Sequence, residues 1–189
     1  MAVTSGQPKP RILDRPRESP LGAAHVITRS PEERPVAFLD LSQDGIPLGR
    51  IEITLFRDQV PFTCDNFMAL CTGEIIGNGR FHKKKMHYKG SPFHRILPGF
   101  ICQGGDYILG NGMGGESIYG RRFRDEALDS QFTKRGQVAM ANNGGNDNSF
   151  SGAQFFVTFA DAPSINSRAV LFGEINDTES MKTCASFGG

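Results

Sequence analysis

The sequence contains no tryptophan and no CxxC pair. Its four cysteines are Cys64, Cys71, Cys102 and Cys184, and none of them lies beside a pair of histidines. This pattern lacks the spacing of zinc and thioredoxin-like motifs and is typical of reduced thiols, so we expect no bound metal. A redox role for Cys71 or Cys184 is the alternative interpretation.

Long apolar runs and a strong net charge are also missing. A membrane-spanning helix needs roughly 20 apolar residues, and no run in this chain approaches that length. The formal net charge of +1 gives no electrostatic reason to bind nucleic acid. The N-terminus lacks the apolar core of a secretory signal, and its prolines would break the helix of a transit peptide. We expect a cytoplasmic protein that contacts neither membrane nor nucleic acid.

The first 34 residues differ from the rest of the chain. They contain five prolines, mixed charge and no clear apolar period. We predict a flexible N-terminal extension over residues 1–34 and one folded domain over residues 35–189. Within the extension, the β-branched residues of segment 25–28 favour addition to a sheet edge.

The folded part shows mainly the pattern of strands. The alternation of apolar residues predicts a strand over 36–41, an Asp44-Gly45 turn and a strand over 51–55. Further short strands are expected at 93–97, 100–103, 137–140, 154–159 and 169–175. Short strands separated by glycine turns predict an antiparallel β-barrel.

Two helices are expected beside these strands. Pro61 is a favourable first helical residue, with Thr63 or Asp65 available near the N-cap, and Gly73 is a plausible end. Residues 178–187 form the second predicted helix.

One strand carries an unusual cation. In the predicted strand over 93–97, Arg95 shares a face with Phe93 and Leu97. An arginine between large apolar residues indicates a cation at the rim of an apolar pocket, although a structural arginine–carboxylate pair is an equal alternative. Phe155 and Phe156 face opposite sides of their strand, so one can line a pocket while the other packs in the core.

Amide side chains complete a candidate site. Gln103 offers a donor and an acceptor, and Asn142 ends a strand. An arginine, amides and aromatics without a nucleophile suit rotation about a prolyl amide, whose barrier is about 18–20 kcal/mol. A hydrogen bond to the prolyl nitrogen weakens the amide conjugation, and polar groups hold the rotating carbonyl in the twisted state.

Several segments resemble those of cyclophilins and occur in the family's order. They are PLGRIEITLF (47–56), NFMALCTGE (66–74), FHRILPGFICQGGD (93–106), MANNGGN (140–146), AQFFVTF (153–159) and VLFGEI (170–175). The resemblance covers residues 35–188. It implies a mainly β fold, a closed eight-stranded antiparallel barrel capped by two α-helices. It also implies peptidyl-prolyl cis–trans isomerase activity on proline-containing peptides and proteins, without a cofactor, in a monomer that assists folding or conformational switching.

The resemblance assigns a role to each site residue. It implies that Arg95 contacts the prolyl nitrogen, that Gln103 supports Arg95 and the substrate carbonyl, and that Asn142 and Ala141 bind the substrate backbone. The expected walls of the proline pocket are Phe100, Ile101 and Phe156. Other residues expected to bind substrate are His94, Asn143, Gln154, Ser164, Ile165 and Ala169. Catalysis is expected from Arg95, Gln103, Phe100 and Asn142.

The chain also departs from the family's pattern. Ser164 stands where many members have tryptophan, Ile165 replaces leucine, and Ala169 stands where many have histidine. Because that tryptophan donates a hydrogen bond to cyclosporin, we expect weak cyclosporin binding. These changes favour a second interpretation, a proline-peptide binding module with little catalysis.

Two further features of the sequence concern the closure of the barrel and a third function class, dinucleotide binding. By resemblance we expect one more strand after the 187–188 region, which would also supply the usual redox partner of Cys71, but the sequence stops at Gly189. Either the sequence is truncated or another segment covers the gap, and residues 23–28 are our candidate for such a segment. The run 110–115 satisfies GxGxxG, but no helical period follows it, so a dinucleotide site is not favoured.

Overall fold

The structure, a computed structural model, describes residues 11–12, 34–75, 83–144 and 149–186, without the side chains of residues 11, 12, 184 and 185. The described strands are β1 (Arg11–Ile12), β2 (Val36–Gln43), β3 (Ile46–Leu55), β4 (Arg95–Leu97), β5 (Ile101–Gly104), β6 (Phe123–Arg124), β7 (Gln137–Asn142), β8 (Phe150–Thr158) and β9 (Leu171–Glu174). The helices are α1 (Pro61–Thr72), a 3₁₀ turn η1 (Pro163–Ile165) and α2 (Thr178–Ala185).

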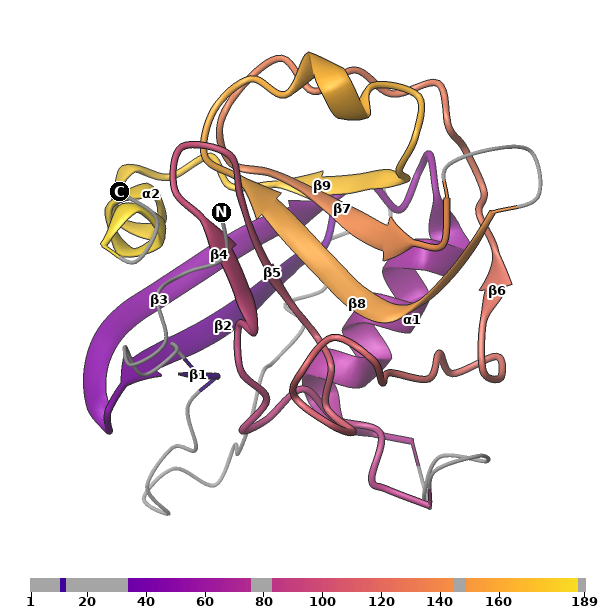
Figure 1. Cartoon of the computed structure of the whole chain (residues 1–189), viewed down its shortest axis with the longest axis horizontal. Coiled ribbons are helices and arrows are strands. Elements are labelled where there is room, and N and C mark those ends of the chain that lie inside the picture. Colours follow the sequence, from indigo (N-terminus) through magenta and orange to yellow (C-terminus); the bar gives the residue numbers. More distant parts are fainter. Residues whose placement is uncertain (1–10, 13–33, 76–82, 145–148, 187–189) are drawn as a thin grey trace.

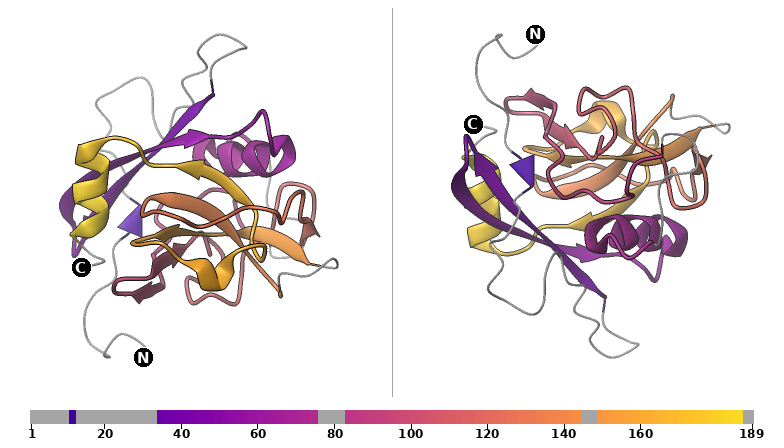
Figure 2. Two further views of the ribbon diagram at one scale, coloured as in Figure 1. Left: turned by 90° about the horizontal axis from the view of Figure 1, so that it is seen from above. Right: turned by 90° about the horizontal axis from the view of Figure 1, so that it is seen from below.

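One antiparallel sheet forms most of the molecule. Its strand order is β1-β2-β3-β9-β7-β8-β5-β4, and β6 pairs with β8 beside this path. The sheet curls, and the two helices lie at opposite ends of it (Figures 1 and 2). The predicted mainly β fold with two helices is confirmed. In the described part of the chain, however, the end strands β1 and β4 do not pair with each other, so the sheet is a curled half-barrel.

The β2–β3 hairpin follows the pattern of its sequence. Asp44 and Gly45 both have positive φ, 53° and 80°, as a tight hairpin turn requires. The strands extend further than predicted, because pairing continues to Gln43 and Ile46. A bulge between Leu41 and Ser42 shifts the register.

Two short strands were not predicted. β6 has only two residues, and β1 pairs Arg11 with Ser42 and Ile12 with Leu41 along the outer edge of β2. The extension therefore does add to a sheet edge, but through residues 11–12. Our candidate segment 23–28 lies outside the described residues.

Different residues define the start and the end of helix α1. Pro61 opens it as predicted, and Gly73 ends it in the left-handed conformation with φ 63°. The predicted cap at Thr63 or Asp65 is wrong, because Val60 occupies the N-cap and makes no side-chain cap. The Glu126 carboxylate accepts the N–H groups of Phe62 and Thr63 at 3.1 and 2.6 Å instead.

Helix α2 packs on β3 and has its own cap. The Asp177 carboxylate accepts the Ser180 N–H at 2.7 Å. The Ser180 hydroxyl in turn accepts the N–H of Glu52 at 2.8 Å, which attaches the helix to the strand. No helix within the described residues is long and apolar enough to cross a membrane.

The sheet separates two apolar clusters. The main core lies inside the curl, where the Phe67 ring packs against the rings of Tyr88, Phe155 and Phe172 at centroid distances of 5.5, 5.1 and 4.9 Å. A smaller cluster that includes Phe156 lies apart from it. Phe155 and Phe156 thus face opposite sides of β8, as their alternation predicted.

Candidate active site

A row of side chains crosses four neighbouring strands. In the antiparallel register, Arg95 of β4 lies opposite Gln103 of β5, Gln103 lies opposite Phe156 of β8, and Phe156 lies opposite Ala139 of β7. Directly paired residues project from the same face with Cβ atoms about 5 Å apart. Three of the residues singled out in the sequence therefore meet on one face, although they are far apart in the chain.

The smaller apolar cluster lies on the same face and forms the candidate proline pocket. Its buried members are Ile101, Phe132, Ala139, Phe156, Ala162 and Ala169. Partly buried residues packed against it are Leu97, Phe100, Ala141, Ile165 and Leu171. The structure thus brings together all six apolar residues that the resemblance assigned to substrate.

Phe132 is a member of this cluster that the sequence reasoning missed. Its ring is 1% exposed and lies 5.9 Å from the Phe156 ring, centroid to centroid. The residue belongs to the irregular segment between β6 and β7, where no periodicity marks the buried positions. Its position depends on a long-range bond, since its N–H donates to Asn166 Oδ1 at 2.7 Å.

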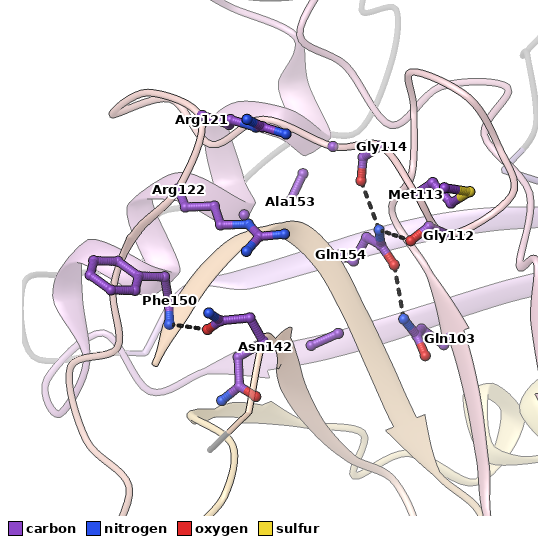
Figure 3. A pocket seen from close by; sticks show the side chains of 14 residues that line it. Gln103, Gly112, Met113, Gly114, Arg121, Arg122, Asn142, Phe150, Ala153 and Gln154 are labelled. Carbon is purple, nitrogen blue, oxygen red and sulfur yellow. Dashed lines mark hydrogen bonds between the residues drawn. The ribbon is translucent and has the colours of Figure 1, made fainter. Parts of the chain in front are cut away.

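The Gln103 amide is oriented by a second glutamine. Gln103 Nε2 donates to Gln154 Oε1 at 2.8 Å, and Gln154 Nε2 donates to the carbonyl oxygens of Gly112 and Gly114 (Figure 3). Because Gln154 uses its amide nitrogen on the loop, only its oxygen is available to Gln103. This arrangement assigns the Gln103 amide nitrogen to Gln154, so the Gln103 carbonyl oxygen points away from it.

A buried carboxylate shapes the loop that holds Gln154. Asp106 is fully buried and accepts five backbone N–H groups, from Ile108, Leu109, Asn111, Gly112 and Gly114. Burial alone would raise the pKa of Asp106, but the backbone donors outweigh it and lower the pKa below its ordinary value. The ionised carboxylate thus keeps the glycine-rich loop in the shape that Gln154 contacts.

The same bonds argue against a dinucleotide site. The N–H groups of Asn111, Gly112 and Gly114, which a phosphate would need, already donate to Asp106. The next element after this loop in the described chain is strand β6 and not a helix, so the geometry of a pyrophosphate site is missing as well.

Asn142 is held at the end of β7 by a polar network. Its Nδ2 donates to Asp125 Oδ2 and to the Arg168 carbonyl oxygen, both at 2.7 Å. The hydroxyls of Ser149 and Ser151 donate to the same Asp125 carboxylate at 2.5 Å. Asp125 was not identified from the sequence, because its partners are scattered along the chain. Its carboxylate fixes the Asn142 side chain, and with it the strand end.

The remaining predicted residues lie around this centre. His94 is buried, and a Cβ added to Gly112 would come within 2.9 Å of its ring. Asn143 is exposed, and its Oδ1 accepts the Phe150 N–H at 2.7 Å. Ser164 is exposed in η1, so the pocket has no large side chain at that position.

Arg95 is exposed at the edge of the sheet. No carboxylate of the described residues pairs with it, which favours the pocket-rim interpretation over a structural ion pair. Arg–Asp pairs form elsewhere: Arg34–Asp58, Arg50–Asp40 and Arg57–Asp65.

The predicted face of Arg95 was wrong in one respect. Leu97 packs against the smaller cluster, but Phe93 lies in the main core. The reason is that β4 begins at Arg95, so strand alternation does not extend back to Phe93.

A pocket of about 290 Å³ opens next to this centre (Figure 3). Gln103, Ala141, Asn142 and Gln154 form one wall, shared with the residues described above. The remaining lining residues are Gly112, Met113, Gly114, Gly115, Arg121, Arg122, Asn143, Phe150, Gly152 and Ala153. The sequence reasoning identified neither arginine, because they lie outside its motifs.

The cysteine thiols and possible metal ligands lie outside the candidate active site. Cys64, Cys71 and Cys102 are buried and form no disulfide with one another, and burial raises the pKa of Cys71 well above its ordinary value. The described residues contain no group of three or more histidine, cysteine or acidic side chains placed to hold a metal ion.

Comparison with known proteins gives a consistent result. Residues 38–187 match the family model of cyclophilin-type peptidyl-prolyl cis-trans isomerases. The chain is 49% identical over 138 residues to peptidyl-prolyl cis-trans isomerase 9 of Caenorhabditis briggsae, covering 73% of this chain and 43% of that protein. It is 48% identical over 141 residues to isomerase cyp11 of Rhizopus delemar, covering 75% and 40%. The chain thus spans less than half the length of these relatives.

A solved structure shows the same fold. A cyclophilin-type peptidyl-prolyl cis-trans isomerase of Cryptosporidium parvum superposes with a TM-score of 0.62 at 35% sequence identity. The superposition covers 75% of this chain and 79% of that one.

Proposed function

We propose that this chain, which belongs to the cyclophilin-type peptidyl-prolyl cis-trans isomerase family, catalyses rotation about Xaa–Pro peptide bonds in proteins and peptides. The observation that carries the proposal is the row of Arg95, Gln103 and Phe156 on one sheet face, directly beside the apolar cluster. That cluster offers a site for the proline ring, and the polar pair stands at its edge.

The geometry supports catalysis without a covalent step. The proline ring packs against Phe100, Ile101 and Phe156, which leaves the Arg95 guanidinium near the prolyl nitrogen. A hydrogen bond donated to that nitrogen grows stronger as the amide twists, because conjugation no longer withdraws its lone pair. Binding that improves only in the twisted state lowers the barrier, by about 1.36 kcal/mol for each tenfold gain in rate.

A protease-coupled assay on an Xaa-Pro peptide tests this function. We expect wild type to accelerate isomerisation and Arg95→Ala to lose most of the acceleration. Arg135→Ala, which changes an exposed arginine outside the site, is the matched control. Equal rates for wild type and Arg95→Ala would contradict the catalytic proposal.

A second candidate function is a proline-peptide binding module of the same fold. The observation that favours it is the open wall formed by exposed Ser164 and by the small side chain of Ala169. A proline ring held less tightly is bound without full stabilisation of the twisted amide. This candidate predicts measurable peptide binding with little acceleration of exchange.

We propose weak binding of cyclosporin for the same structural reason. Ser164 occupies the position from which, by resemblance, an indole N–H would donate to the drug. The short Ser164 side chain offers neither that reach nor the apolar area of an indole. Titration calorimetry is expected to give a dissociation constant above the micromolar range, and a sub-micromolar value would contradict the proposal.

We also propose that the sheet closes into an eight-stranded barrel and that the protein is a monomer. Closure requires a strand between the edges of β2 and β4, and β1 already pairs along β2. Hydrogen exchange tests the idea: deletion of residues 1–20 is expected to speed exchange along β2 and β4 but not along β7. Unchanged exchange in both edge strands would contradict it.

A further inference from the structure

The pocket beside the proline site contains two cationic side chains and no anionic one. Arg121 and Arg122 line it, and every other lining residue is neutral. Figure 3 shows both guanidinium groups extending toward the wall that carries Gly114 and Gln154. The formal charge of the whole chain is only +1, so this is a local concentration of positive charge.

The acidic residues that follow in the sequence are committed to other contacts. Asp125 accepts from Asn142, Ser149 and Ser151, and Glu126 accepts from the first turn of α1. Among the described residues, neither Arg121 nor Arg122 forms an ion pair with a carboxylate. Both guanidinium groups are therefore available to an anion from outside the molecule.

The position of the pocket indicates which part of a substrate enters it. The pocket shares Gln103, Ala141 and Asn142 with the residues that, by the family resemblance, hold the carbonyl and the backbone of the substrate. An extended chain advances about 3.3–3.6 Å per residue, so the next residues toward the N-terminus reach the pocket. Side chains that follow the proline leave in the other direction.

We propose that this pocket selects substrates with an anionic side chain, a carboxylate or a phosphate, one to three residues before the proline. The inference rests on the proposed function, since it needs the proline to occupy the apolar cluster. Arg121 and Arg122 supply the charge, and Met113 and Asn143 also line the pocket.

The expected size of the preference for an anionic side chain follows from the solvent exposure of Arg121 and Arg122. Both are solvent-exposed, and exposed ion pairs are individually weak and screened by salt. Two of them together correspond to roughly a three- to tenfold preference in kcat/KM for a carboxylate over its amide. A phosphate carries more charge and accepts bidentate hydrogen bonds from arginine, so its preference should be larger.

Exchange NMR on a matched set of peptides tests the inference. The peptides share one Xaa-Pro bond and carry glutamine, glutamate, phosphoserine or lysine at each of the three positions before proline. Acceleration of the glutamine peptide reports the proposed function by itself. The ratio of glutamate to glutamine reports the pocket, and it is expected to decrease at high salt.

Variants show whether the two arginines are responsible. In R121Q/R122Q the ratio of glutamate to glutamine is expected to fall to about one, whereas in R135Q, a charge-matched control outside the pocket, it should persist. A melting curve for each variant confirms that it is folded. Ratios near one for both glutamate and phosphoserine relative to glutamine at every position in wild type, or an unchanged preference in R121Q/R122Q, would overturn the inference. A preference confined to phosphoserine would identify phosphopeptides as the substrate class.

Discussion

Asn142 is held by the Asp125 carboxylate, whereas the two glutamines of the site obtain their orientation from neutral hydrogen bonds. Gln154 shows this clearly, because it donates to two loop carbonyls and accepts from Gln103. Such an arrangement keeps the Gln103–Gln154 pair at the edge of the apolar cluster uncharged, with the cation Arg95 opposite Gln103 on the neighbouring strand. It also explains why Gln103 was informative about the site in the sequence, although a glutamine side chain alone carries no specific chemistry.

Site residues could be predicted from the sequence where a recognisable motif lies within a regular strand. Arg95, Gln103 and Phe156 belong to segments whose alternation assigns faces correctly from the strand start onward. Phe132 and Asp125 could not be found in this way, because their roles depend on contacts with Phe156, Asn142 and two serines far along the chain. Contacts of that kind arise only when the sheet curls.

The thiol of Cys71 provides a test at this scale. It is 2% exposed, and burial raises its pKa, so both access and the thiolate fraction are low at neutral pH. We expect no alkylation of Cys71 by iodoacetamide in the native protein and full alkylation after denaturation. Peptide mass spectrometry makes the measurement. Rapid native alkylation would restore the redox interpretation.

At the scale of elements, the loop after β5 depends on one carboxylate. Asp106→Asn replaces one accepting oxygen by a donor that faces N–H groups, which we expect to cost roughly 3 kcal/mol of unfolding free energy. Asp129→Asn, at an exposed aspartate, is the matched control. Urea unfolding measures both, and equal stabilities would contradict the role given to Asp106.

The lowered pKa of Asp106 also predicts a pH dependence. Below the ordinary aspartate value of about 3.9, the unfolded chain binds the proton before the folded protein does. The stability from this group is therefore full above that pH and is lost as pH falls through the lower folded pKa. Unfolding curves of Asp106→Asn should show a flatter acid limb than wild type. An identical limb would contradict the assignment.

Helix α1 is capped from outside. The Glu126 carboxylate accepts the Phe62 and Thr63 N–H groups and the Thr63 hydroxyl, the last two at 2.6 Å. Glu126→Ala should therefore destabilise the fold by about 1 kcal/mol, the usual effect of losing a cap. Thermal or urea unfolding checks this against Glu74→Ala, an exposed glutamate in the loop after the helix. Equal effects of the two substitutions would contradict it.

The cap illustrates what local sequence signals miss. The proline start and the glycine end of α1 were predicted, since both act through their own backbone. The carboxylate that satisfies the first turn is more than sixty residues away in the chain. No local pattern indicates such a partner.

At the scale of the whole molecule, the positions of most strands in the chain could be predicted, but not the closure of the sheet. Alternation and glycine turns identified the strands from β2 to β9, with the exception of two-residue β6. Closure depends on pairing between distant edges, and the described sheet ends at β1 and β4. The site lies on the face formed by β4, β5, β8 and β7, so its geometry does not require the closing strand.

The central claim is that the site both binds a proline-containing peptide and catalyses its isomerisation. Both properties can be measured in one sample. Exchange NMR of an Xaa-Pro peptide reports the isomerisation rate, and chemical-shift changes during the titration report affinity. We predict fast exchange with wild type and, with Arg95→Ala, a loss of about two orders of magnitude or more in rate while peptide still binds, since removing one transition-state hydrogen-bond donor costs about 2.7–4 kcal/mol. Wild type that binds the peptide without accelerating exchange would contradict the account.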